Sequence, residues 1–195
     1  MGEQRAERAD AARNRRAILG AAEELLRSHA PDEVSIERIA AAAGVGKGTV
    51  FHRFGSRVGL MRALMEERVR ALGEAVAGGP PPLGPGAPPR DRLVAFLDAV
   101  VGVAARNGRL ITAHDHALAT RRHAEGRLTD NPVYLSWHAH VTSLIAEARP
   151  DLDADLVAHV LVGSMHNEGV ARLLLAGESE RVAAGMRAMA ESLLR

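Results

Sequence analysis

The segment 38–57 contains four cationic residues and no acidic residue. They are Arg38, Lys47, Arg53 and Arg57, and Lys47 is the only lysine of the chain. A local excess of positive charge is typical of side chains that bind phosphate groups. The net charge of the whole chain is only +1, so the clustering of these cations, rather than the total charge, predicts a surface that binds nucleic acid.

The elements that position these cations are predicted to be two short helices around a glycine turn. Apolar residues of the first helix recur at helical spacing and give it one buried face: Ile36, Ile39, Ala40 and Ala43. Ser35 is placed to cap this helix, and Glu37 is favoured in its first turn. Gly44 supplies the left-handed backbone that ends the helix.

The second short helix opens with Lys47, Gly48 and Thr49, while Val50 and Phe54 turn back to the core. Gly48 has no side chain, so the backbone can approach a phosphate or a base edge closely there. This pattern is typical of a helix-turn-helix, which places its second helix in the major groove of DNA. Lys47 is predicted to reach a base edge or a phosphate; the alternative is an ordinary solvated lysine.

The stretch from about Arg15 to Leu72 resembles the tetracycline-repressor (TetR) family. The resemblance is carried by Ile18–Ala22, Ser35–Ala40, Ala43–Val45, Gly48–Phe54 and Ser56–Leu60. It implies an all-α homodimer that binds operator DNA, usually as a repressor. It also implies a C-terminal domain with a pocket for a small molecule whose binding releases the DNA.

The resemblance also implies which residues contact DNA. The predicted DNA-binding residues are Ser35, Arg38, Lys47, Gly48, Thr49, Phe51, His52, Arg53 and Arg57. Two positions depart from the family pattern: Gly46 stands where a serine often caps the recognition helix, and Phe51 stands where a tyrosine hydroxyl often binds phosphate. A third departure is the Gly/Pro-rich segment 78–90, which is longer than the usual connection.

Helical periodicity over nearly the whole chain predicts an all-α fold. We expect a helix-turn-helix domain at 1–57, a connecting helix at 58–77, a Gly/Pro-rich linker at 78–90 and a helical ligand-binding and dimerisation domain at 91–195. Separate helices are expected at 91–106 and 109–119, followed by a loop at 120–130. Asn131 and Pro132 are expected to begin a further helix.

One helix is predicted to run to Gly177 after an Asp153 cap, and it is apolar on most sides over 155–175. A helix of that kind must be buried all round. We expect it to pair, together with the last helix, with the same helices of a second copy in a four-helix bundle; the alternative is a central helix of a monomer. The predicted interface residues are Val160, Gly163, Ala171, Leu174, Val182, Met186, Met189 and Leu193.

The best pocket candidates are polar or aromatic residues within otherwise apolar helices. They are Phe96, His114, Tyr134, Trp137, His138, Met165, His166 and Asn167. Plain packing is the alternative for each of them. Seven of the nine histidines follow the linker, but the pairs at 114/116 and 138/140 point to opposite sides of a helix, so we predict no metal site from one helix face. A site built across helices, and a metal- or pH-responsive regulator, remain alternatives.

Composition excludes several classes of function. With no cysteine, the chain has no disulfide, thiol nucleophile or thiolate metal site. Residues 1–10 lack a signal-peptide core, and no stretch approaches the roughly 18 apolar residues of a membrane span, so we expect a cytoplasmic protein. Motifs of serine hydrolases, phosphate loops, metalloproteases and dinucleotide enzymes are missing. We therefore expect no enzyme and no cofactor; an enzyme, or a helix-turn-helix that binds only protein, are the minor alternatives.

Overall fold

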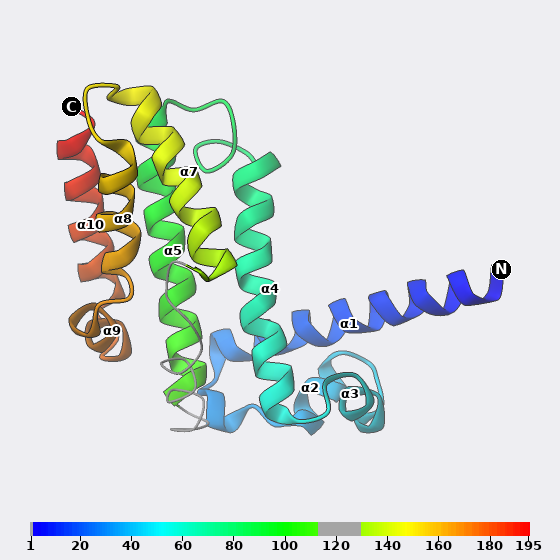
Figure 1. The fold of residues 1–195 in the computed structure, drawn as a ribbon. Helices are drawn as coiled ribbons and strands as arrows, with labels where there is room; N and C mark the ends of the chain where they lie inside the picture. The colour runs from blue at the N-terminus through cyan, green and yellow to red at the C-terminus, as the bar shows by residue number, and fades with distance from the viewer. Residues whose placement is uncertain (1, 113–129) are drawn as a thin grey trace. The chain divides into compact units, whose positions relative to one another are not determined.

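A computed structural model describes residues 2–112 and 130–195, which form helices and contain no β-strand (Figure 1). The predicted all-α fold is therefore confirmed. The chain forms two compact units, Met1–Arg68 and Val69–Arg195. Helix α4, Arg57–Gly78, contributes residues to both of them.

The first unit contains α1 (Gly2–Ser28), a 3-10 turn (Pro31–Glu33), α2 (Ile36–Ala42), α3 (Lys47–Phe54) and the first half of α4. Each helix contributes apolar side chains to the core, among them Ile18, Ile39, Val50 and Leu60, which are fully buried. A partly buried ion pair adds to this packing, because Nε of Arg68 donates to Glu23 at 2.8 Å.

The caps and the turn of the helix-turn-helix are as predicted from the sequence. The Ser35 hydroxyl accepts a hydrogen bond from the Arg38 N–H and caps α2. Gly44 adopts a φ of 66°, in the left-handed region that ends the helix. Gly46 is the N-cap of α3 and offers no side-chain hydrogen bond, whereas the Ser56 hydroxyl accepts from the N–H of Gly59 at the start of α4.

The second unit contains α5 (Pro89–Thr112), α7 (Pro132–Ala148), α8 (Ala154–Ser164), α9 (Glu168–Leu175) and α10 (Ser179–Leu193). Helices α5, α7, α8 and α10 pack around an aliphatic core that includes Leu93, Val141, Leu161 and Met186. Asn131 caps α7 and Asp153 caps α8, both as predicted.

The structure corrects the prediction of one helix over 155–175. The chain leaves the helical path after Ser164, and the side chain of Asn167 accepts from the N–H of Gly169 to begin α9 as a new helix. The sequence interpretation took Asn167 for a polar group within a helix and missed its role as a cap. Because the segment is two helices, its apolar side chains do not all have to surround one axis.

Helix α5 also ends later than predicted. It continues past Arg106 to Thr112, because Asn107 and Gly108 do not interrupt it. Most of the helix expected at 109–119, and all but the last residue of the loop expected at 120–130, fall outside the described residues. Residues 79–88 connect α4 to α5, and the N–H of Gly84 donates to the carbonyl of Pro80 within this connection. In the described parts of the chain, no helix is long and apolar enough to cross a bilayer.

Candidate nucleic-acid interface and effector site

Helix α3 presents four of the nine predicted DNA-binding residues to solvent. Lys47, Gly48, Phe51 and His52 are exposed, and Phe51 keeps 42% of its surface accessible. Thr49 is half-buried. Fully buried Val50 anchors the opposite side of the helix. The short helix is thus held from behind, and one face is free for a partner.

Lys47 has two neighbours on this face. Its ammonium group forms an ion pair with Glu37 of α2, and it lies 5.7 Å from the centre of the Phe51 ring. The hydrogen bond from Lys47 lowers the pKa of the Glu37 carboxyl to about 2. Glu37 therefore stays charged at neutral pH and opposes part of the positive charge of the helix.

Two of the other predicted cations brace the loop before α2. Arg38 is exposed and donates to the carbonyl of Glu33 at 3.0 Å, and it also contacts Nε2 of His29 at 2.9 Å. The guanidinium of Arg57 donates to the carbonyls of Pro31 and Val34. Burial lowers the pKa of Arg57, and the charge of Asp32 partly opposes this shift. Arg57 thus holds the loop before α2 in place, and its predicted phosphate contact stays a prediction.

Arg53 has a different environment from the exposed residues of α3. Its side chain is half-buried, and its Nε is enclosed and has no hydrogen-bond partner among the described residues. Ser35 is occupied as the cap of α2. The predicted DNA-binding residues therefore divide into exposed residues, which are Arg38 of α2 and four residues of α3, and less exposed residues, among which Ser35 and Arg57 make structural hydrogen bonds.

In the second unit, the predicted pocket residues form two groups. In the first, Phe96 of α5 meets Trp137 of α7 edge-on, with ring centres 6.2 Å apart. His140, which was not among the pocket candidates, also meets Phe96 edge-on at 4.8 Å. Burial, followed by the charge of Arg92, lowers the pKa of His140. Nε of Arg92 and Nε2 of His140 are buried and have no hydrogen-bond partner within the described parts of the chain.

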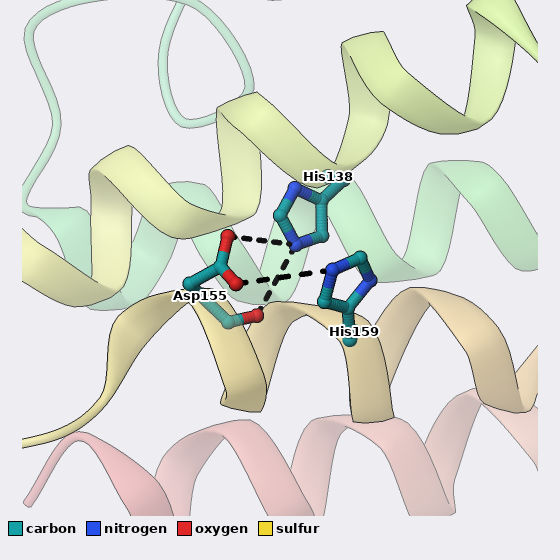
Figure 2. A group of neighbouring side chains, drawn as sticks. All are labelled: His138, Asp155 and His159. Atoms are coloured by element: carbon teal, nitrogen blue, oxygen red, sulfur yellow. Dashed lines mark hydrogen bonds and ion pairs between the residues drawn. The ribbon is translucent and has the colours of Figure 1, made fainter. Parts of the chain in front are cut away.

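The second group joins α7 to α8, and Figure 2 shows three of its residues, His138, Asp155 and His159. The Tyr134 hydroxyl lies 2.7 Å from Nδ1 of His159, and the Tyr134 ring stacks near both His138 and His159. His166 meets the same ring edge-on at 5.9 Å. Asp155 lies beside both histidines. Burial, followed by the negative charge of Asp155, raises the pKa of Tyr134, so its hydroxyl stays neutral.

The other predicted pocket residues lie apart from these ring contacts or outside the described residues. Met165 is buried in the core of the second unit. Asn167 is exposed as the cap of α9. His114 is not among the described residues. The ligand-binding roles of all these residues stay predictions.

The predicted interface residues also divide by burial. Leu174, Val182 and Met186 are buried in the core of a single chain, and Leu193 packs partly against that core. Gly163 is half-buried and Ala171 is exposed. Val160 and Met189 are large apolar residues with 64% and 49% of their surface accessible. Helices α8 and α10 meet where the hydroxyl of Ser164 contacts the sulfur of Met186 at 3.8 Å.

Sequence reasoning missed the partners Glu37, Asp155, Arg92 and His140. Glu37 lies one residue before the segment in which cations were counted, and the turn brings it back to Lys47. Asp155 and His159 are four residues apart, which places them on one face of a helix, and this spacing was the available signal. The positions of Arg92 and His140 in the sequence give no such signal, because packing between helices brings them together.

Comparison with known proteins finds similarity to one family of bacterial regulatory proteins. Residues 18–64 match the family model described as bacterial regulatory proteins, tetR family. A TetR transcriptional regulator from Streptomyces coelicolor is 23% identical over 93% of this chain and 98% of its own, with a TM-score of 0.63. A second tetR-family regulator from that organism is 22% identical over 92% of this chain and 79% of its own, with a TM-score of 0.58.

The fatty acid degradation regulator FadR from Bacillus halodurans is also similar, at 16% identity over 92% of this chain and 94% of its own, with a TM-score of 0.55. No curated protein matches the sequence. The solved structures share the fold, and the family model covers the helix-turn-helix and its supporting helices. Residues 18–64 thus match a segment of the tetR family of bacterial regulatory proteins, and the chain shares the fold of solved TetR regulators.

Proposed function

We propose that two copies of this chain bind an operator as a homodimer, that the bound protein represses transcription, and that a small molecule releases it from DNA. The observation that carries the proposal is the exposed face of α3, which presents Lys47, Phe51 and His52 within the segment that matches the family model. A helix presented in this way enters the major groove, where side chains reach base edges and phosphates.

The test of DNA binding begins with fragments selected from random duplex DNA by the full chain. The variant Lys47→Ala/His52→Ala removes two exposed side chains from α3, so we expect it to bind a selected fragment at least about tenfold more weakly in a mobility-shift assay. We also expect a shallower salt dependence, by about 0.9 in the log–log slope for each phosphate contact that is lost.

The control for this experiment is Arg27→Ala. Arg27 is an exposed arginine of α1 in the same unit, paired with Glu24, so the substitution removes a positive charge outside the helix-turn-helix. It should leave affinity for the selected fragment nearly unchanged. Equal affinity of the α3 double variant and the wild type would overturn the proposal. Substitution of Arg57 is avoided because it would remove the bonds that brace the loop before α2.

The ligand response is supported by the group around Phe96. Two enclosed nitrogens, Nε of Arg92 and Nε2 of His140, have no hydrogen-bond partner within the described residues, and the rings of Phe96 and Trp137 meet beside them. Buried polar groups are normally hydrogen-bonded. We therefore propose an effector that combines an apolar or aromatic body with a hydrogen-bond acceptor such as a carboxylate.

The effector proposal is tested by screening carboxylate-bearing aromatic and aliphatic compounds for release of the selected DNA fragment. The variant Arg92→Met keeps a long apolar side chain but removes the donors, so it should still bind DNA and should respond less to an active compound. Arg90→Met, at an exposed arginine two residues away, is the matched control. An unchanged response in Arg92→Met would place the effector elsewhere.

A further inference from the structure

Three side chains from two helices converge at one point between α7 and α8 (Figure 2). Nε2 of His138 lies 3.6 Å from Oδ1 of Asp155, and Nε2 of His159 lies 3.8 Å from Oδ2 of the same carboxylate. One donor atom from each residue lies within 4.8 Å of the other two. We propose that His138, Asp155 and His159 bind one divalent transition-metal ion, which would make this the site across helices that the sequence analysis kept as an alternative to its prediction of no metal site.

The separations between each histidine and the Asp155 carboxylate are close to those between ligands of a common ion. Distances of 3.6 and 3.8 Å are too long for hydrogen bonds between imidazole and carboxylate. Ligand atoms that share a tetrahedral zinc ion, at bonds of about 2.1 Å, lie about 3.4 Å from one another. Asp155 and His159 keep 72% and 41% of their side-chain surface accessible, so small side-chain rotations can close the remaining gap without disturbing the core.

Tyr134 supplies the outer support that metal-binding histidines usually have. A histidine that binds a metal through one ring nitrogen normally donates a hydrogen bond through the other, and this bond fixes the tautomer and the ring orientation. Nδ1 of His159 lies 2.7 Å from the Tyr134 hydroxyl. With the proton on Nδ1, Nε2 of His159 has a lone pair directed at the side of Asp155, as the proposed site requires.

Binding of the ion requires a change of tautomer at His138. In the metal-free protein, Nε2 of His138 lies 3.1 Å from the backbone carbonyl of Asp155, which is hydrogen-bond distance. When Nε2 binds the ion, the neutral imidazole of His138 takes the tautomer with its proton on Nδ1, and this bond is given up. The Asp155 carbonyl also belongs to the first turn of α8, so helix geometry supplies it with a backbone partner.

The set of donors indicates the class of ion. Two imidazoles with one carboxylate suit zinc, nickel and cobalt(II), whereas magnesium and calcium prefer oxygen ligands throughout. Only 12% of the His138 side chain is accessible, but Asp155 is mostly exposed. The site is therefore open on one side, where water can complete the coordination of the ion.

An ion at this position would tie α7 to α8 beside an apolar stripe. Asp155 and His159 lie four residues apart on α8, and exposed Leu156 and Val160 follow them on the adjacent stripe of the same helix. The ion would thus order the helix that carries Val160, a predicted residue of the dimer interface. The metal site itself does not depend on that interface or on DNA binding.

The experiment is calorimetric titration of ZnCl₂ into the full-length, tag-free chain in a buffer that does not bind metal. We expect one zinc ion per chain and a higher melting temperature in its presence. Cobalt(II) should bind in the same ratio, with visible absorption bands typical of low coordination number. Asp155→Asn and His159→Ala should each weaken zinc binding at least about tenfold, and Tyr134→Phe, which removes only the hydroxyl, should weaken it by about 10- to 100-fold.

Two controls separate this site from the other histidines. His52→Ala removes an exposed histidine of α3, and His114→Ala/His116→Ala removes the pair outside the described residues; zinc affinity should be unchanged in both. The proposal is overturned if the wild-type chain binds no zinc, or if Asp155→Asn binds it as tightly as the wild type. Loss of binding in the 114/116 variant alone would also overturn it. Asp155→Asn is nearly isosteric at an exposed position, so circular dichroism should show an intact fold.

Discussion

Lys47 is held on the surface of α3 by the Glu37 carboxylate and the Phe51 ring. A phosphate or base edge that binds Lys47 must compete with Glu37 for the ammonium group. The same carboxylate repels the DNA backbone, and its pKa of about 2 keeps it charged at neutral pH. Glu37 therefore limits affinity at the residue that the sequence marks most clearly for DNA contact.

We predict that Glu37→Gln strengthens binding of the chain to duplex DNA. The gain should be a few-fold at most, because both partners of the ion pair are more than half exposed and such pairs are weak. Since the lowered pKa keeps Glu37 ionised, the difference between variant and wild type should be the same from about pH 5 to pH 8. Mobility-shift titrations at several pH values measure this.

Glu24→Gln is the matched control for charge. Glu24 is an exposed acid of α1 that pairs with Arg27, so its substitution changes the net charge equally but leaves Lys47 paired. An equal gain in both variants would show that total charge, and not the release of Lys47, sets the affinity.

Helix α4 begins so close to the end of α3 that one position accepts only glycine. A Cβ added at Gly59 would lie 2.0 Å from the backbone carbonyl oxygen of Phe54. At Gly73, in the same helix, an added Cβ would meet nothing within 4 Å. Helix propensity treats these two glycines alike, but the corner between α3 and α4 makes them different.

We predict opposite effects on stability for alanine at these two positions. Gly59→Ala should lower the free energy of unfolding by about 1–3 kcal/mol, because backbone must move to remove the clash. Gly73→Ala should raise it by about 0.5–1 kcal/mol, because alanine is the better helix former. Urea unfolding followed by circular dichroism measures both. A stabilised Gly59→Ala variant would mean that the α3–α4 corner is looser than the structure indicates.

At the scale of the whole molecule, the distribution of apolar surface narrows the proposed dimer interface. Three of the large exposed apolar residues lie on α8 and α10: Leu156, Val160 and Met189. Leu174, Val182 and Met186, which the sequence assigned to the interface, are already buried within one chain. We therefore propose that the exposed set makes the contact between copies, in keeping with the tendency of exposed apolar patches to mark interfaces.

We predict that Val160→Glu/Met189→Glu is monomeric in sedimentation equilibrium and binds operator DNA poorly. A two-fold dimer gains affinity because its two recognition helices enter successive major grooves of the DNA, and a monomer has only one such helix. Each substitution is at a largely exposed position, so the fold of the chain should persist. Leu135→Glu, at a comparably exposed apolar residue of α7, should leave the mass unchanged. A dimeric double variant would remove α8 and α10 as the interface.

Local signals in the sequence predicted much of the fold. Ser35, Asn131 and Asp153 each cap the helix that they were expected to cap, because the capping bond joins residues two or three positions apart. The position of Asn167 was misread, because an asparagine between two apolar runs is compatible with either a continuous helix or a new start. Only packing of the two runs against different neighbours separates these cases.

By itself, the sequence determined that the chain is all-helical and carries a helix-turn-helix with an outward, cationic second helix, because helical spacing, caps and turn glycines act over a few residues. The tertiary structure alone decided that Glu37 would pair with Lys47, that Gly59 would lie against Phe54, and that His138 would meet Asp155. Each of these contacts joins different elements, and His138 and Asp155 are 17 residues apart. Such contacts depend on how whole helices pack, and no local spacing records that.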